Sequence, residues 1–193
     1  MRHYIIYIPG LGDGYDPLRR LALLFWRIFG VTVEYVPMKW YDGKSYDEKY
    51  QRVETAVRNA QALGFTVSIV GESAGASMAM NVFAQTSSVH RLISLCGVNS
   101  SHTPISPRIF KRSPGFKQSV SRVDRSRTKV IASRVGQVTS IIARSDSTVP
   151  PEKNSISGAR QIEIWSMGHI FTIVLCLSIC SFIVIQQVRR RVA

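Results

Sequence analysis

Short runs of β-branched and aromatic residues alternate with longer segments of helical periodicity along most of the chain. Each short run fits a strand, and each longer segment can hold a helix that leads from one parallel strand to the next. The strands are expected at 4–8, 31–36, 65–70, 90–98, 138–143 and 161–165. We therefore predict an α/β fold with a mostly parallel sheet of about six strands and helices on both faces.

Three segments between these strands have the periodicity and ends of helices. The segment 17–29 is followed by Gly30 and carries apolar residues at helical spacing, namely Leu18, Leu21, Leu24, Phe25 and Ile28. Asp47 is the expected cap of a helix over 48–63 that ends at Gly64. A third helix, rich in Ala and Met, is expected over 73–85.

The length of 193 residues suits one domain, so we treat residues 1–193 as a single unit. Hydrophobic residues make up 45% of the chain and charged residues 19%, a balance that excludes disorder through excess charge. We find no internal repeat.

Positive charge is concentrated in the segment 99–134, within a chain of net charge +13. Asp124 is the one acidic residue there, against nine basic residues: Arg108, Lys111, Arg112, Lys117, Arg122, Arg125, Arg127, Lys129 and Arg134. The segment is interpreted as a basic insertion between strands, either a solvated surface helix or a lid-like patch that faces anionic phospholipids. It matches no nucleic-acid-binding module, so nucleic acid is not a favoured partner.

Three cysteines, Cys96, Cys176 and Cys180, lack the spacing of a zinc site or a disulfide framework. We interpret them as buried thiols in a reducing compartment and expect no metal. The apolar run at 4–8 is too short for the core of a signal peptide, which favours a cytoplasmic protein.

The most specific motif is Gly71-Glu72-Ser73-Ala74-Gly75, a G-x-S-x-G between a predicted strand and a predicted helix. A serine on such a sharp turn projects its hydroxyl above the sheet, and the turn requires small residues at both glycine positions. The start of the following helix favours negative charge. Ser73 is therefore the candidate nucleophile.

A base and an acid follow Ser73 in the chain order that this arrangement requires. Asp146 follows the strand 138–143, and His169 follows the strand 161–165. Both lie at carboxyl ends of strands, the edge where open α/β sheets place their sites. His102 is the alternative base and Glu152 the alternative acid.

Two backbone N–H groups are the candidate donors to an oxyanion: that of Ala74, directly after the nucleophile, and that of Leu11 in the loop after the first strand. An ordinary glycine turn is the alternative interpretation of this loop. The aromatic pair Trp40-Tyr41 is interpreted as packing, with a wall of the substrate site as the alternative.

These motifs resemble those of the α/β-hydrolase superfamily, including its esterases and lipases, from residue 4 to about residue 188. The matching pieces are I-P-G-L-G after the first strand, G-E-S-A-G at the turn, S-D-S-T-V-P around Asp146 and G-H at His169. The resemblance implies a minimal α/β-hydrolase fold with Ser73 as nucleophile, His169 as general base and Asp146 as the acid that orients it.

The segment 170–188 carries no formal charge, is strongly apolar up to Ile185, and is followed by Arg189, Arg190 and Arg191. A helix over this segment is short for a membrane span. We favour a helix that covers the sheet and exposes one face to a membrane or a partner, and keep a fully buried helix and a true span as alternatives; the basic residues could add attraction to an anionic membrane.

The predicted function is hydrolysis of a carboxylic ester or thioester, without a metal or organic cofactor, by a protein that is cytoplasmic or peripheral on a membrane. One alternative is a membrane-associated interaction protein whose triad has no catalytic role. Another is an amidase, peptidase or acyltransferase with the same triad.

Overall fold

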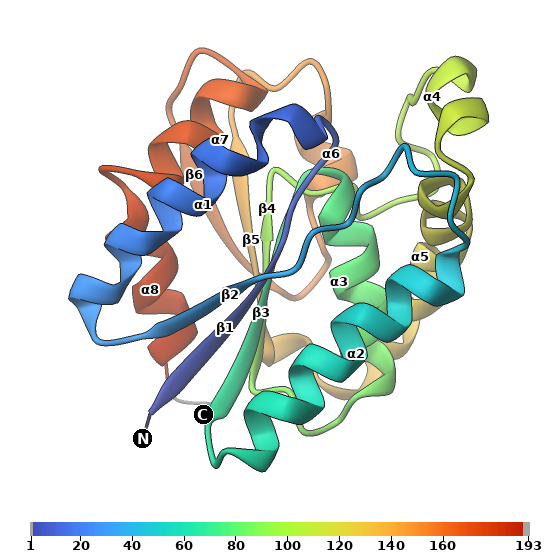
Figure 1. Ribbon diagram of the computed structural model, residues 1–193. Helices are drawn as coiled ribbons and strands as arrows, with labels where there is room; N and C mark the ends of the chain where they lie inside the picture. The colour runs from blue at the N-terminus through green and yellow to red at the C-terminus, as the bar shows by residue number, and fades with distance from the viewer. Residues whose placement is uncertain (1, 191–193) are drawn as a thin grey trace.

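Six parallel strands form one sheet in the computed structural model, which describes residues 2–190 (Figure 1). The strands are β1 (His3–Ile8), β2 (Thr32–Tyr35), β3 (Thr66–Glu72), β4 (Arg91–Leu95), β5 (Val138–Ala143) and β6 (Arg160–Ile164). Their order in the sheet is β2-β1-β3-β4-β5-β6, and every neighbouring pair is parallel. The predicted fold class is confirmed.

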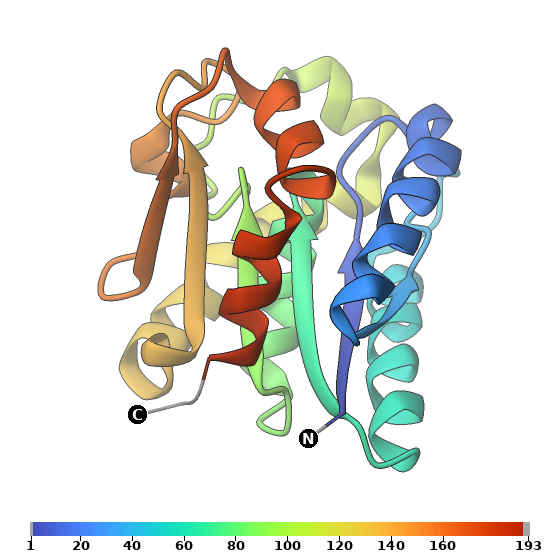
Figure 2. The ribbon, with the colours of Figure 1, turned by 90° about the vertical axis from the view of Figure 1, so that its left-hand side faces the viewer.

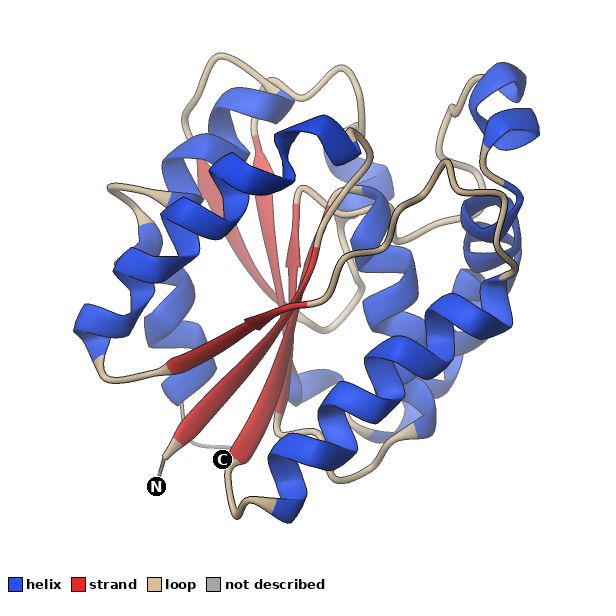
Figure 3. Ribbon diagram, viewed as in Figure 1, coloured by secondary structure: helices blue, strands red, loops and turns tan. Residues whose placement is uncertain are grey.

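Helices cover both faces of the sheet (Figure 3). One face carries α2 (Tyr46–Ala62), α3 (Ala74–Gln85) and α5 (Pro114–Ser133). The other carries α1 (Asp16–Phe25), α7 (His169–Leu177) and α8 (Ser181–Arg189), which lie in front of the sheet in Figure 2. Crossover helices on both faces bury the central strands, which explains why β5, and β4 after Arg91, consist of apolar and small residues.

The remaining helical elements are short: α4 (Pro107–Arg112), α6 (Pro151–Asn154) and three 3₁₀ helices, η1 (Asp13–Tyr15), η2 (Trp26–Phe29) and η3 (Val135–Gln137). The helix expected over 17–29 is thus α1 followed by η2, and Gly30 ends it with a φ of 66°. The predicted strand ends differ from the observed ones mainly at the fourth strand, which stops at Leu95 because Cys96 turns to a φ of 46°.

The N-cap of α2 is Ser45, so the cap predicted at Asp47 is wrong. The Ser45 hydroxyl accepts a hydrogen bond from the Glu48 N–H, and the Glu48 carboxylate accepts one from the Ser45 N–H. This reciprocal pair satisfies two backbone donors, whereas a cap at Asp47 would satisfy one.

The apolar stripe of α1 and η2 points mostly away from the core. Leu18, Leu21, Phe25 and Ile28 are at least half exposed, while Leu23 and Trp26 are the buried apolar residues. Helical spacing identifies the residues that share a face but carries no information about what that face meets.

The basic segment 99–134 forms α4 and α5. Phe116, Val120, Val123 and Val130 of α5 are buried against α3, and the basic side chains lie largely on the opposite, solvent side. The segment therefore supplies a crossover helix of the fold.

The apolar segment 170–188, expected as one helix, forms the two helices α7 and α8 with a bend of 69° between them. Within residues 2–190, no single helix is long and apolar enough to cross a membrane. The two helices of this bent pair reach that length and apolar composition only when they are taken together. Arg191 lies outside the described residues.

Candidate active site

Ser73, His169 and Asp146 meet at the carboxyl edge of the sheet, where β3, β5 and β6 end. The Ser73 hydroxyl lies 2.8 Å from Nε2 of His169, and Nδ1 of the same ring lies 2.6 Å from Oδ2 of Asp146. With the ring neutral, the serine hydroxyl donates to Nε2 and the Nδ1–H donates to the carboxylate. The three residues form one continuous line of hydrogen bonds.

The turn that presents Ser73 is strained and tightly packed. Ser73 has a φ of 48° and a ψ of −117°, a conformation that costs energy in a residue with a side chain. A Cβ atom on Gly75 would lie 2.3 Å from the Ile8 carbonyl oxygen, and one on Gly71 would lie 2.6 Å from Cα of Ala76. Both glycine positions of the motif are thus required by close approach of the backbone.

Asp146 is oriented from both sides. Its Oδ1 accepts hydrogen bonds from the backbone N–H groups of Thr148 and Val149, at 2.9 and 2.8 Å. Its Oδ2 is left to His169. Since Asp146 is 5% exposed and its oxygens accept charge-assisted bonds, the carboxylate is held in one position.

The candidate oxyanion loop lies directly against the nucleophile. A Cβ atom on Gly10 would lie 2.8 Å from Cβ of Ser73, so only glycine fits at this point. Ala74 begins α3, and Leu11 follows Gly10 in the loop between β1 and η1. The loop and the start of α3 therefore bring both predicted N–H groups into the neighbourhood of Ser73.

A buried ion pair, which the sequence interpretation did not include, joins the loop to the serine turn. The Arg19 guanidinium donates to both carboxylate oxygens of Glu72, at 2.6 and 2.9 Å, and also to the carbonyl oxygens of Leu11 and Gly12. The Tyr7 hydroxyl donates to the same carboxylate at 2.5 Å. The sequence signals for this pair were weak: Arg19 stands beside a second arginine, Arg20, in α1, and Glu72 directly precedes the nucleophile.

Burial and charge set the ionisation of this cluster. Burial, together with the negative charge of Glu72, raises the pKa of Tyr7 well above its ordinary value, so Tyr7 stays a neutral donor. Burial opposes the charge on Arg19, but the Glu72 carboxylate outweighs it and raises the pKa of Arg19. Arg19 therefore keeps its positive charge beside the Glu72 carboxylate.

Trp40 supports the same loop from the other side. Its side chain is completely buried, and its indole N–H donates to the Pro9 carbonyl at 3.0 Å. Trp40 therefore serves packing, as the sequence interpretation favoured, and fixes the chain one residue before Gly10.

Cys96 lies close to the acid and the base. The potential ligand atoms of Cys96, Asp146 and His169 all lie within 4.8 Å of one another. Nδ1 of His169 and Oδ2 of Asp146 are 2.6 Å apart, however, whereas two ligands of a tetrahedral zinc ion are separated by about 3.3 Å. Burial, and then the charge of Asp146, raises the pKa of the Cys96 thiol, which disfavours the thiolate that a metal needs. The trio suits a hydrogen-bonded triad better than a metal centre.

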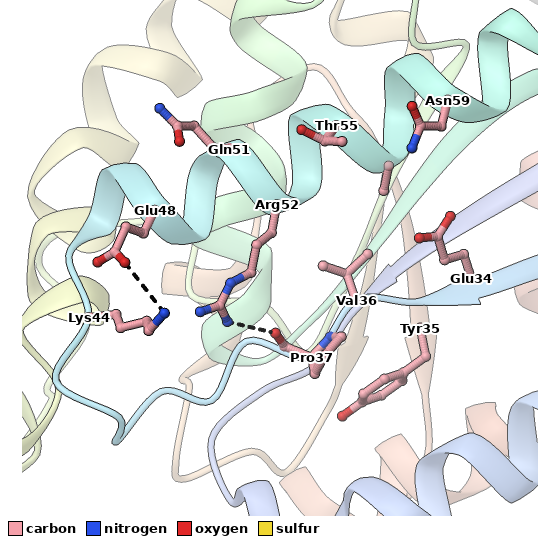
Figure 4. A pocket seen from close by; sticks show the side chains of 11 residues that line it. Glu34, Tyr35, Val36, Pro37, Lys44, Glu48, Gln51, Arg52, Thr55 and Asn59 are labelled. Carbon is pink, nitrogen blue, oxygen red and sulfur yellow. Dashed lines mark hydrogen bonds and ion pairs between the residues drawn. The ribbon is translucent and has the colours of Figure 1, made fainter.

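Two open hollows lie away from these residues. One, of about 540 Å³, lies between the edge strand β2 and α2 (Figure 4). Its charged side chains already have partners: Arg52 donates to the Pro37 carbonyl, Lys44 pairs with Glu48, and Glu34 accepts a hydrogen bond from the Tyr4 hydroxyl. The second, lined by Phe29, Phe182 and three arginines, lies beside α8.

The rival candidates His102 and Glu152 have no hydrogen bond to Ser73 or His169 within residues 2–190.

Several solved structures with the same fold are described as hydrolases or lipolytic enzymes. Est1E from Butyrivibrio proteoclasticus, with ferulic acid bound, has a TM-score of 0.69 and 14% identity, covering 97% of this chain and 90% of that one. A structure from work on LipS and LipT, two metagenome-derived lipolytic enzymes, has a TM-score of 0.68 and 14% identity, covering 96% and 91%. A protein from Xanthomonas campestris described as a hydrolase of the alpha/beta superfamily has a TM-score of 0.65 and 18% identity, covering 96% and 99%.

No family model matches the chain, and no curated protein matches it in sequence. The six-stranded parallel sheet and these structural neighbours nevertheless define its class: the chain has an α/β-hydrolase fold.

Proposed function

We propose that the protein is a serine hydrolase that cleaves a carboxylic ester or thioester through an acyl-enzyme. The observation that carries this proposal is the line of hydrogen bonds from Ser73 through His169 to Asp146. The esterases and lipolytic enzymes among its structural neighbours support an ester substrate.

In the first half of the reaction, the Ser73 oxygen attacks the carbonyl carbon of the ester while its proton passes to Nε2 of His169. Asp146 holds the ring in the required tautomer and stabilises the imidazolium that forms. The oxyanion of the tetrahedral intermediate accepts hydrogen bonds from the N–H groups of Ala74 and Leu11. The C–O or C–S bond then breaks, and His169 gives its proton to the leaving alcohol or thiol.

In the second half, His169 removes a proton from water, and the resulting nucleophile attacks the acyl carbon on Ser73. Collapse of this second intermediate breaks the bond to Ser73, which takes the proton back from His169. The carboxylic acid leaves, and the hydrogen bonds among the three residues are restored.

The apolar surroundings of the base support a substrate with an apolar acyl group. Met167 and Ile170 flank His169 and are largely exposed, so an alkyl or aryl group that approaches the base meets apolar side chains.

We place the enzyme in the cytoplasm, where free thiols such as Cys96 stay reduced, and at an anionic membrane.

The same geometry serves an amidase, a peptidase or an acyltransferase, and the fold also occurs without turnover. These alternatives differ from the proposal in measurable ways. An acyltransferase gives more ester than acid when an alcohol is added, and a protein without turnover does not react with a serine probe.

The test is labelling of the purified chain with a fluorophosphonate probe. The parent is expected to be labelled on Ser73, and Ser73→Ala to lose the label completely. In Asp146→Asn, the turnover of a soluble short-chain ester should fall by about 10⁴-fold, because the His169 ring is no longer held in the required tautomer and orientation. Ser145→Ala is the matched control, since Ser145 is an exposed serine next to Asp146.

Labelling of Ser145→Ala and of the parent should be equal. If a folded parent, checked by circular dichroism, took no label, the enzyme proposal would be rejected. A label that persisted in Ser73→Ala would assign the nucleophile to another residue.

A further inference from the structure

Large apolar side chains are exposed on one side of the molecule and almost nowhere else. Of the sixteen exposed large apolar residues within residues 2–190, thirteen lie between residues 15 and 28 or between residues 165 and 182. We call these thirteen side chains the apolar face. They belong to α1, α7, α8 and the adjoining turns, which lie side by side in front of the sheet in Figure 2, where α1 packs against α7.

The inner sides of these helices are already used for packing. Trp26, Ile173 and Val184 are buried in the core beneath them. The indole N–H of Trp26 donates to the Leu177 carbonyl at 3.0 Å and so joins η2 to α7. The apolar face is therefore the fixed outer surface of packed helices, and a large exposed apolar patch of this kind marks an interaction site.

The charges beside the apolar face are mostly positive: Asp16, at the start of α1, is paired with Arg19, and Glu163 lies two residues before Trp165. The chain has no Asp or Glu between Pro17 and Gly30 or between Trp165 and Arg190. Exposed arginines flank both stretches: Arg20 and Arg27 on the first, Arg189 and Arg190 at the end of the second. Arg144 adds a further cation, stacked 4.0 Å above the ring of Trp165. Apolar side chains edged by arginines match an anionic lipid surface, with acyl chains below and phosphate groups at the edge.

The apolar face also reaches the candidate active site. His169 is the first residue of α7, and the exposed Met167 and Ile170 stand on either side of it. At the start of α1, Tyr15 and Leu18 follow the candidate oxyanion loop and are 64% and 65% exposed.

We propose that the apolar face docks the protein on an anionic lipid bilayer and that the active site receives its ester substrate from that bilayer. The second half of this proposal rests on the proposed function, and the first half does not. A second copy of the chain is the other possible occupant. A two-fold dimer would bring the arginines of both copies to one interface, where their like charges disfavour association, whereas a bilayer supplies the opposite charge.

The test is co-sedimentation of the full-length Ser73→Ala variant with vesicles, since this variant leaves the lipid intact. We expect binding to vesicles of phosphatidylcholine with phosphatidylglycerol, and weaker binding to phosphatidylcholine alone or in high salt. Leu18→Glu and Phe171→Glu should each weaken binding by about 10- to 100-fold, because each replaces an apolar group that the bilayer buries.

Leu63→Glu is the matched control. Leu63 is 64% exposed, as Leu18 is at 65%, but it lies at the end of α2 on the other side of the sheet. Vesicle binding of Leu63→Glu should equal that of its parent. Equal loss in Leu63→Glu and Leu18→Glu, or no sedimentation with anionic vesicles, would overturn the proposal. So would a dimer, seen by analytical ultracentrifugation, that Leu18→Glu dissociates and that does not bind vesicles.

The experiments distinguish a failure of the docking proposal from a failure of the proposed chemistry. If docking is wrong, the parent still takes the fluorophosphonate label on Ser73. If the proposed chemistry is wrong, Ser73→Ala still sediments with anionic vesicles and Leu18→Glu does not.

Discussion

The two faces of the sheet carry helices of opposite design. On one face, α5 buries Phe116, Val120 and Val123 and exposes basic side chains, as a surface helix of a soluble domain does. On the other, α1 buries Arg19 and Leu23 and exposes a stripe of Leu and Phe. The apolar residues of α5 therefore stabilise the fold, whereas the second face buries one set of apolar residues in the core and leaves another set available to a partner.

The largest expected effect compares two phenylalanines, one on each face. Phe116→Ala removes a buried ring that packs edge to face on Trp40, and should lower the free energy of unfolding by about 3–5 kcal/mol. Phe25→Ala removes a ring that is 63% exposed and should change it by less than about 0.5 kcal/mol. Urea denaturation measures both. If Phe25→Ala lowered the free energy of unfolding as much as Phe116→Ala, the apolar face would be packed in solution.

The next effect concerns Arg19, the buried charge on the apolar side. Arg19→Ala leaves the Glu72 carboxylate without its ion pair and should cost about 3 kcal/mol of stability. It also frees the carbonyls of Leu11 and Gly12, so kcat should fall more than KM rises, because oxyanion donors act mainly in the transition state.

Arg20→Ala is the control for Arg19, since Arg20 is exposed and stacks over the ring of Tyr35. It should cost less than about 1 kcal/mol and leave kcat unchanged. Partial recovery of kcat in Arg19→Lys, without recovery of stability, would separate positioning of the loop from structural support.

A smaller effect tests the cap of α2 on the packed face. Ser45→Ala should lower the free energy of unfolding by about 1 kcal/mol, because the Glu48 N–H loses its acceptor. Asp47→Ala removes only an exposed ion pair with Arg122 and should cost less than about 0.5 kcal/mol. Thermal denaturation measures the loss of stability in both variants. A larger loss of stability in Asp47→Ala than in Ser45→Ala would show that Asp47 is the N-cap.

The smallest effect is spectroscopic. Trp26 and Trp40 are completely buried, while Trp165, on the apolar face, is 76% exposed. Anionic vesicles should therefore shift the tryptophan emission to shorter wavelength through Trp165 alone, and Trp165→Phe should abolish the shift. A shift that persists in Trp165→Phe would indicate a change of structure at the buried tryptophans instead.

Much of the fold and the arrangement of the candidate site followed from local patterns. The alternation of strands and helices, the G-x-S-x-G turn and the chain order of Ser73, Asp146 and His169 are local features of sequence. Parallel strands bring their carboxyl ends to one edge, so these three side chains were predicted to meet there, and they do. Their catalytic role stays a prediction until Ser73 is labelled.

Other features depend on contacts between distant residues. Arg19 and Glu72 are far apart in the sequence and pair only because α1 packs beside the end of β3. The cap at Ser45 is, by contrast, a local feature, because Ser45 and Glu48 form the S-x-x-E pattern of a capping box and the sequence contained that signal. The bend between α7 and α8 falls at residues 178–180, in a segment with no Pro or Gly from which a break could be predicted.

The sequence by itself determined the strands, the order of elements and the position of the serine turn, because periodicity and turn chemistry act over a few residues. Only the tertiary structure decided which way the stripe of α1 points and which charges are buried. The reason is physical: the free energy of burying a side chain depends on what packs against it, and in this protein those neighbours come from distant parts of the chain.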